Sequence, residues 1–498
     1  ADPDQALNHW ERLLAGSVNR SSLIQYLQSS PKMLGLLCTI FGNSDSLAFA
    51  LIRDPMLIYW LAEEDVLTTA PTREGMVTAL RQSLGSLKAM ELKLDVLRRV
   101  RRREMLRIGV RDLLRLATVE ETTASLSDLA SVLIHAAYEI VDKALKALHG
   151  TPMHQLADGT WVETEFVVIG MGKLGAHELN YSSDVDLIYV YGSAEGETRK
   201  GKGNRQARVD AVSNEEYFEM LARSLTKALA EQTREGAVFR VDLRLRAEGT
   251  VGQLARSVEA YAKYYAQRGQ VWERLALLKA WPVAGSPVVG QAFVQMVEGF
   301  IFQPDPHPLT RERALAVIRE VRSVKEMIDE KIAVRGHQHR NVKLGTGGIR
   351  EIEFLVQTIQ VLIGRSVPGV LDRKTVGALH RFCRHRFVNE GDEQRLTEAY
   401  WFLRDVEHKL QMMHDLQTHA LPDSSEELQR CAIRMGYQAV SREAALEQFL
   451  ADRQRHTAVV HQTFRSLFYH PETSDLLSAV VAAAEGHFRR SMSRLEKE

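Results

Sequence analysis

Two aspartates, Asp184 and Asp186, stand two residues apart in a run that continues to Tyr191 and is otherwise apolar, mostly β-branched or aromatic. Such a run is typical of a β-strand. Residues two apart on a strand project from the same face, so the two carboxylates would lie a few ångströms apart and repel unless a cation lay between them. Carboxylate oxygens suit Mg²⁺, which completes its shell with water and substrate phosphates. The pair therefore predicts a Mg²⁺ site that handles a nucleotide.

A third carboxylate comes from a later segment, 237–246, in which apolar and charged residues alternate. This alternation predicts a strand with one buried face, and it places Asp242 on the polar face with Arg240, Arg244 and Arg246. In a two-metal site such a carboxylate can bridge to the second ion and accept the proton of an attacking hydroxyl during in-line displacement. The residues predicted to hold the metal and to be catalytic are Asp184, Asp186 and Asp242.

Glycines, hydroxyls and cations near these carboxylates could bind phosphate. The glycine turn at 170–175 allows close backbone approach, and two serines precede Asp184. The residues predicted to bind nucleotide or phosphate are Gly170, Gly172, Lys173, Ser182, Ser183, Arg244, Arg246, Arg274, Lys279 and Arg350. For the last three cations the alternative is a salt bridge to a nearby glutamate, such as Glu273, Glu351 or Glu353.

The glycine turn also matches GxGxxG, the dinucleotide-binding pattern, at Gly170, Gly172 and Gly175. A parallel crossover needs a dozen or more residues, whereas the next strand begins by about Ser183. The acidic residue of that pattern should also stand alone at the end of the second strand, but here two aspartates occupy its beginning. Metal-dependent nucleotidyl transfer is therefore favoured, and a nicotinamide-dependent enzyme remains the rival interpretation.

The elements that must position these residues follow from hydrophobic periodicity. Apolar residues recur at helical spacing before 148 and again after Gly285, whereas a strand is expected at 161–169 and a loop at 192–204. The prediction is an α+β, mostly helical fold built around a nucleotidyltransferase palm of the polymerase-beta type. It comprises a helical N-terminal domain at 1–148, the palm at 149–300 and a C-terminal helical bundle at 301–498.

Composition narrows the classes of partner. The 498 residues contain 64 Lys plus Arg and 64 Asp plus Glu, so no bulk positive field favours a nucleic acid. Three scattered cysteines without a CxxC pair suit a reducing compartment. No apolar run of membrane-span length and no signal peptide are evident. We expect a cytoplasmic protein without a membrane or nucleic-acid partner.

A basic cluster lies at 98–103, where five of six residues are arginine. It could suggest a membrane surface or a nucleic acid. Because Leu97, Val100 and Leu106 form an apolar stripe beside it, a solvated helix face or an ion-paired contact with a neighbouring domain is favoured.

Three motifs occur in the chain: Gly170-Met-Gly-Lys-Leu-Gly-x-x-Glu-Leu-Asn-x-Ser-Ser-Asp-x-Asp-Leu-Ile188, Arg240-Val-Asp-x-Arg-Leu-Arg246, and Trp272-Glu-Arg274 with Lys279-Ala280. Together they resemble the glutamine synthetase adenylyltransferase family, also called the adenylyl-removing enzyme. Members carry two tandem nucleotidyltransferase halves, but only one set of motifs occurs here. The family's Arg-Leu-Arg-Pro run ends in Ala247 in this chain.

The segment 341–354, Asn-Val-Lys-Leu-Gly-Thr-Gly-Gly-Ile-Arg-Glu-Ile-Glu-Phe, resembles the N-terminal, deadenylylating half of that family. The resemblance implies that phosphate attacks adenylyl-tyrosine of glutamine synthetase, releasing ADP and unmodified enzyme. It also implies Mg²⁺, ATP or ADP and phosphate as ligands, and the PII signalling protein as a partner in regulating nitrogen metabolism. Two alternatives are AMP transfer from ATP to the tyrosine, and a regulatory module that senses nucleotide without turnover.

Overall fold

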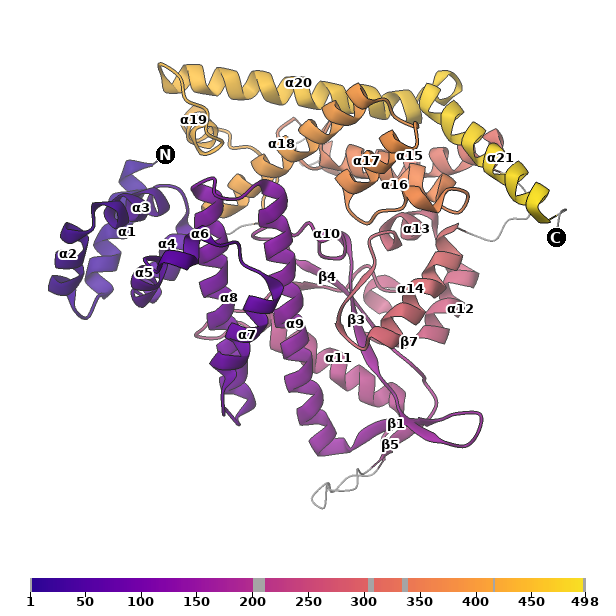
Figure 1. Cartoon of the computed structure of the whole chain (residues 1–498), viewed down its shortest axis with the longest axis horizontal. Helices are drawn as coiled ribbons and strands as arrows, with labels where there is room; N and C mark the ends of the chain where they lie inside the picture. Colours follow the sequence, from indigo (N-terminus) through magenta and orange to yellow (C-terminus); the bar gives the residue numbers. More distant parts are fainter. Residues whose placement is uncertain (1, 200–210, 303–308, 334–338, 415–416, 496–498) are drawn as a thin grey trace.

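The structure is a computed structural model that describes residues 2–199, 211–302, 309–333, 339–414 and 417–495. Figure 1 shows helices of the N-terminal part on one side, a small sheet in the middle, and the C-terminal helices across the top. Helices dominate throughout, which confirms the predicted α+β, mostly helical class.

The N-terminal part is an array of helices. Their bounds are α1 (Pro3–Gly16), α2 (Arg20–Ser29), α3 (Pro31–Phe41), α4 (Asp45–Arg53), α5 (Met56–Leu61), α6 (Glu64–Thr68), α7 (Arg73–Leu84), α8 (Met90–Leu113) and α9 (Val119–His149). A capping box starts α9, where the Thr118 side chain accepts from the Glu121 amide and the Glu121 carboxylate accepts from the Thr118 amide. By length and composition α9 could cross a membrane, but 61% of its most apolar window is buried inside the protein, as in a core helix.

Two sheets follow α9. The first is a small antiparallel sheet in the order β2 (Trp161–Glu163), β1 (Thr151–Gln155) and β5 (Glu197–Arg199). The strand expected at 161–169 is therefore two strands in different sheets. The chain changes sheet at Thr164, whose amide donates to the carbonyl of Pro152, and β5 lies in the segment expected to be a loop.

The second sheet carries the predicted carboxylates. Its order is β6 (Val241–Asp242), β4 (Val185–Tyr191), β3 (Phe166–Gly170) and β8 (Trp281–Gly285), and β7 (Ala255–Ser257) also pairs with β4. β3 is antiparallel to both β4 and β8, whereas β4 is parallel to β6 and β7. The strand expected at 237–246 is wrong in extent, because only Val241 and Asp242 pair as a strand.

Each face of this sheet packs against a different set of helices. Val185, Leu187 and Tyr189 of β4 belong to a core shared with the N-terminal helices, α9 and α11 (Asn214–Ala230). Ile188 and Val190 belong to a core shared with the C-terminal helices. Because strand residues alternate between faces, Asp186 lies on the side of the C-terminal helices.

Helix α14 (Pro287–Phe302) packs against β3, β4 and β8, and α12 (Val258–Arg268) packs against β7. The other helices of this part of the chain are α13 (Val271–Leu277), α15 (Arg311–Ala333), α16 (Ile349–Ile363), α17 (Thr375–Arg384), α18 (Glu390–His414), α19 (Ser425–Arg434), α20 (Arg442–Phe468) and α21 (Asp475–Leu495). Short 3-10 turns occur at Gly249–Val251, Pro368–Val370 and Pro471–Thr473. The division at 148 and 300 remains a proposal, since both cores continue across the palm strands.

Candidate active site

A cavity of about 510 Å³ lies where the β4 and β6 end of the sheet meets α13, α15 and α16. These three helices thus form one wall of a site whose other wall is the palm. The predicted site residues that line the cavity are Gly172, Lys173, Ser183, Asp184, Asp186, Asp242, Arg244, Lys279 and Arg350.

The three carboxylates line the same cavity, and strand register explains the placement of two of them. Asp186 of β4 and Asp242 of β6 are Cα partners in the parallel pair, so their side chains project from the same face. Asp184 lies one residue before β4, two residues from Asp186, and lines the same cavity. Burial, followed by the charges of Asp242 and Asp184, raises the pKa of Asp186 to about 6. The site therefore concentrates negative charge on a carboxylate poorly solvated by water.

Position 172 requires a glycine because the turn passes close to the side chain of Asp186. The φ of Gly172 is +53°, and a Cβ atom there would lie 2.5 Å from Oδ2 of Asp186. Gly175 has a similar constraint, because its Cβ would lie 1.8 Å from the carbonyl oxygen of Lys279. The turn containing both forms a single helical turn, α10 (Gly172–Gly175).

The dinucleotide interpretation of these glycines is wrong for the fold. The GxGxxG pattern requires a parallel βαβ crossover, whereas β3 and β4 are antiparallel neighbours joined through α10. The glycines instead permit tight packing of the turn against Asp186 and the backbone at Lys279.

Two of the carboxylates are engaged by arginines. Nε of Arg240 lies 2.7 Å from Oδ1 of Asp184, and Nε of Arg244 lies 2.9 Å from Oδ2 of Asp242. Burial opposes ionisation of Asp242, but hydrogen bonds from Arg244 outweigh it and lower the pKa of Asp242. Asp186 has no ion-pair partner among the described residues, although it is the most buried of the three.

The carboxylates fit a hard divalent cation by donor chemistry and by charge. They supply only oxygen donors, and the raised pKa of Asp186 reflects negative charge that a cation would offset. Within the described ranges no three acidic, histidine or cysteine side chains converge closely enough to form a complete metal cage. In this structure Asp184 and Asp242 are instead held in ion pairs with Arg240 and Arg244.

Cations line the opposite wall. Nζ of Lys279 lies 2.7 Å from Oε1 of Glu353, and Arg350 lies beside the same glutamate. Both cations therefore form the expected alternative, a salt bridge, and both also line the cavity. Lys343 also lines it, and sequence reasoning did not include it. Burial and then the charge of Arg350 lower the pKa of Lys343. The available signal was its place in the Lys343-Leu-Gly345 run that suggested the family half.

Lys173 lines the cavity, but its ammonium group forms an ion pair with a glutamate of α18. Nζ is 2.7 Å from Oε1 of Glu407 on α18, both side chains are buried, and burial lowers the pKa of Lys173 to about 7. Glu407 also accepts from Asn180 at 2.5 Å. Glu178 of the same motif accepts from the amide of Thr375 at 2.9 Å. Lys173 and these motif residues thus anchor the palm turn to the C-terminal helices, which differs from the predicted phosphate-binding role of Lys173.

Four predicted residues do not line the cavity. Gly170 packs in the sheet against Val283, and Ser182 lines a different cavity. The guanidinium of Arg246 donates to loop carbonyls, including those of Leu243 and Gly252. Arg274 donates through Nε to the carbonyl of Ile301. In this structure both arginines hold backbone segments and lie outside the cavity, so the phosphate-binding roles expected for Arg246 and Arg274 are not part of the proposed site.

Comparison with known proteins agrees with this arrangement. A family model described as glutamate-ammonia ligase adenylyltransferase matches residues 34–296, which is more than half of the 498 residues. The chain belongs to this family. Its match includes the glycine turn, β4 and β6, so the family signature covers all three carboxylates. The resemblance stated from the motifs is confirmed.

Curated relatives of the family match most of the chain. Three proteins named bifunctional glutamine synthetase adenylyltransferase/adenylyl-removing enzyme are similar to it. That of Nitrosococcus oceani is 37% identical over 88% of this chain and 43% of its own length. That of Rhizobium meliloti is 41% identical over 69% and 33%, and that of Mesorhizobium japonicum is 35% identical over 89% and 43%. The chain therefore spans less than half the length of these relatives.

A second family model matches the C-terminal helices. It is described as GlnD PII-uridylyltransferase and matches residues 322–468, a range that contains Lys343, Arg350 and Glu407. The helices that close the candidate site thus resemble those of another nucleotidyltransferase family.

Proposed function

We propose that the chain is a Mg²⁺-dependent nucleotidyltransferase that removes AMP from adenylyl-tyrosine of glutamine synthetase by phosphorolysis. The observation that carries the proposal is one cavity with three carboxylates on one wall and three cations on the other. The carboxylates are Asp184, Asp186 and Asp242, and the cations are Lys279, Lys343 and Arg350.

The carboxylates would hold Mg²⁺, which supplies charge neutralisation to the phosphate being transferred. The chain's own task is to position the reacting groups. Lys343 and Arg350 face the carboxylate wall and can bind the inorganic phosphate that acts as nucleophile. Phe354 and Leu275 give the cavity apolar wall area that excludes water.

The reaction joins an oxygen of inorganic phosphate to the phosphorus of the adenylyl group. The bond from that phosphorus to the tyrosine oxygen breaks, the leaving oxygen takes up a proton, and ADP is released. Asp242 lies beside Asp186 and is kept ionised at neutral pH by Arg244, so it can accept the proton that the nucleophilic phosphate loses. Neither bond change requires a redox cofactor.

Phosphorolysis is proposed over ATP-dependent adenylylation because of segment 341–354. This segment supplies Lys343 and Arg350 to the cavity, and its sequence resembles the deadenylylating half of the family. The same carboxylates could transfer AMP from ATP to the tyrosine, so the experiment must distinguish the two directions.

The test uses adenylylated glutamine synthetase, Mg²⁺ and radiolabelled inorganic phosphate. We expect one molecule of labelled ADP to form for each adenylyl-tyrosine that loses its AMP group. Asp184→Asn and Asp186→Asn should each abolish ADP formation, whereas Asp65→Asn, the same change at an exposed site on α6, should not. Consumption of labelled ATP without use of phosphate would instead identify adenylylation. Nucleotide binding without turnover of either label would identify a regulatory module.

The proposal includes the partners and the compartment. Glutamine synthetase is named in the relatives' descriptions, and the match of 322–468 to a PII-uridylyltransferase family model supports a connection to the PII signalling protein. Three free cysteines, at 38, 383 and 431, agree with a cytoplasmic location.

A further inference from the structure

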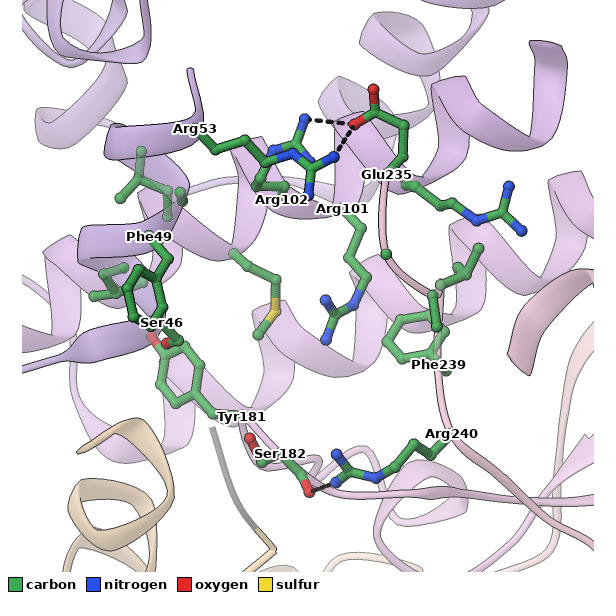
Figure 2. Close-up of a pocket in the computed structure, with 18 of the residues that line it drawn as sticks. Ser46, Phe49, Arg53, Arg101, Arg102, Tyr181, Ser182, Glu235, Phe239 and Arg240 are labelled. Carbon is green, nitrogen blue, oxygen red and sulfur yellow. Dashed lines mark hydrogen bonds and ion pairs between the residues drawn. The ribbon is translucent and has the colours of Figure 1, made fainter. Parts of the chain in front are cut away.

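A second cavity, of about 420 Å³, lies on the other side of the Ser182-Ser183 turn. It is enclosed by α4, α8, residues 181–183 and the segment 232–240 that leads into β6. Figure 2 shows this cavity with the side chain of Arg101 at its centre. Its volume falls within the range of small-molecule sites.

The cavity has an excess of positive charge. Five arginines line it against two carboxylates, Asp45 and Glu235, and two of the five, Arg98 and Arg240, also pair with Asp95 and Asp184 outside the lining. The arginines are Arg53, Arg98, Arg101, Arg102 and Arg240. Glu235 is shared by three arginines, since its Oε2 lies 2.9 Å from Nη2 of Arg102 and 3.4 Å from Nη2 of Arg53, and its Oε1 lies 3.6 Å from Nη1 of Arg99. One carboxylate cannot accept from every N–H group of three guanidinium groups, so some donors stay available to an anion.

Arg98 donates from Nη1 to Asp95, but another polar atom of its buried side chain, and one of Tyr181, lack hydrogen-bond partners among the described residues. Arg98 is 3% exposed, and its Nε has no hydrogen-bond partner in the part of the chain that the structure describes. The buried hydroxyl of Tyr181 is likewise without a partner among the described residues. Buried donors without partners are rare in native proteins and indicate a place where a ligand or water supplies the acceptor.

Aromatic side chains form the walls. Figure 2 shows Phe49 and Tyr181 on one side and Phe239 on the other, with Arg101 between them. The guanidinium carbon of Arg101 lies 5.3 Å from the centroid of the Phe239 ring. Such walls suit a planar group, and guanidinium forks suit a phosphate. Both chemistries occur in a nucleotide.

The cavity adjoins the candidate active site. Ser183 lines both cavities. Arg240 connects them, because its Nε lies 2.7 Å from Asp184 while its Nη2 donates to the carbonyl of Ser182 at the wall of the second cavity. An anion that attracted Arg240 would weaken its ion pair with Asp184, and that carboxylate would then be available to a metal ion.

We propose that this cavity binds a nucleoside monophosphate, and that binding tightens the divalent-cation site through Arg240. The coupling rests on the proposed function, because it assigns Asp184 to the metal. Binding itself is independent of it. By reciprocity, bound metal must tighten nucleotide binding by the same factor.

The first experiment measures binding of AMP to the full chain in EDTA by calorimetry, with inorganic phosphate and adenosine as separate probes. We expect AMP to bind at least about tenfold more tightly than either probe, because each probe lacks one of the two recognised groups. Arg101→Gln and Arg53→Gln should each weaken AMP binding about tenfold or more. Arg53 is 44% exposed, so its variant is expected to fold.

The matched control is Arg244→Gln, which removes an arginine from the active-site cavity and should leave AMP binding in EDTA unchanged. Loss of binding in Arg244→Gln with retention in Arg101→Gln would place the nucleotide in the active-site cavity and overturn the proposal. Equal binding of phosphate and AMP would overturn the assignment of a nucleoside.

The second experiment titrates Mn²⁺, followed by electron paramagnetic resonance, with and without AMP. We expect AMP to tighten Mn²⁺ binding about fivefold or more in the wild type and not in Arg240→Gln. AMP binding without any change in Mn²⁺ affinity would contradict the coupling. If the chain binds AMP in EDTA but forms no ADP, the proposed function is refuted, whereas the nucleotide site in this cavity is supported.

Discussion

At the residue scale, Asp186 matters most to the proposed metal site. It is the one of the three carboxylates without an ion-pair partner among the described residues. Its pKa is raised to about 6 by burial and by its acidic neighbours. A carboxyl group with a raised pKa contributes stability that is fully present below its unfolded pKa and is lost as the pH rises through about 6. Without metal, the folded chain therefore becomes less stable between about pH 4 and pH 7 on account of this group.

Asp186→Asn should remove that loss. In EDTA at pH 8 we expect the variant to be more stable than the wild type by up to about 3 kcal/mol, and at pH 4 by much less. Urea unfolding at the two pH values measures the difference. A variant that is less stable than the wild type at pH 8 would contradict the placement of Asp186 among uncompensated charges.

Gly172 gives a second residue-scale prediction. Gly172→Ala adds a Cβ that would lie 2.5 Å from Oδ2 of Asp186, at a backbone φ of +53°. Asp186 must then move, so we expect the rate of ADP formation to fall about a hundredfold. Gly159→Ala is the control, because Gly159 also has positive φ but meets only the Gln155 side chain, at 3.5 Å. Similar activity in Gly172→Ala and Gly159→Ala would contradict the proposal that a Cβ atom at position 172 displaces Asp186.

Site residues were predictable from the sequence where spacing alone determines geometry. Asp184 and Asp186 are two apart, and strand alternation dictates that they share a face. Arg246 and Arg274 were assigned to phosphate, but their partners are backbone carbonyls. No side-chain pattern reveals such partners. Lys343 was missed because it comes from a turn far along the chain that folding brings to the cavity.

At the element scale, the sequence predicted the helical parts and the segments that hold β2, β3, β4 and β6, but it did not predict β1, β5, β7 or β8. The segment 237–246 alternates as a strand should, yet only β6 pairs. The amide of Arg244 donates to the carboxylate of Asp242, 2.8 Å away, which diverts the backbone from the ladder. This local bond ends the strand at the residue that carries the chemistry.

The turn after β3 is held by a contact with α18. Lys173→Met would leave Glu407 buried without its main cation, and we expect a loss of about 3–5 kcal/mol in unfolding free energy. The double variant Lys173→Met with Glu407→Gln should recover part of that loss, since no uncompensated charge remains. Chemical denaturation of the single and double variants measures the coupling. Additive effects in the double variant would show that the pair does not act as a unit.

At the scale of the whole molecule, the active-site cavity exists because α13, α15 and α16 pack over the palm. Figure 1 shows α13 near the sheet, with α16 and α15 above it. Periodicity predicted a C-terminal bundle but not this contact, because hydrophobic spacing says which face of a helix is buried and not against which element.

A substitution at Lys343 tests whether this closure contributes to phosphate binding. Lys343 reaches the cavity from the turn before α16 and has no ion pair within the described ranges. Lys343→Met should raise the KM for phosphate by about tenfold or more, because one cation of the phosphate-binding wall is lost. The KM for adenylylated glutamine synthetase should change little. An effect confined to kcat, with an unchanged KM for phosphate, would contradict a role in binding the nucleophile.

The central claim is that three acidic side chains from two adjacent strands converge on a divalent cation. Mn²⁺ titration of the wild-type chain and single variants tests it without reference to any substrate. We expect Asp186→Asn and Asp242→Asn each to weaken Mn²⁺ binding by at least about tenfold, and Asp65→Asn to leave it unchanged. Equal Mn²⁺ affinity in all four proteins would contradict the account.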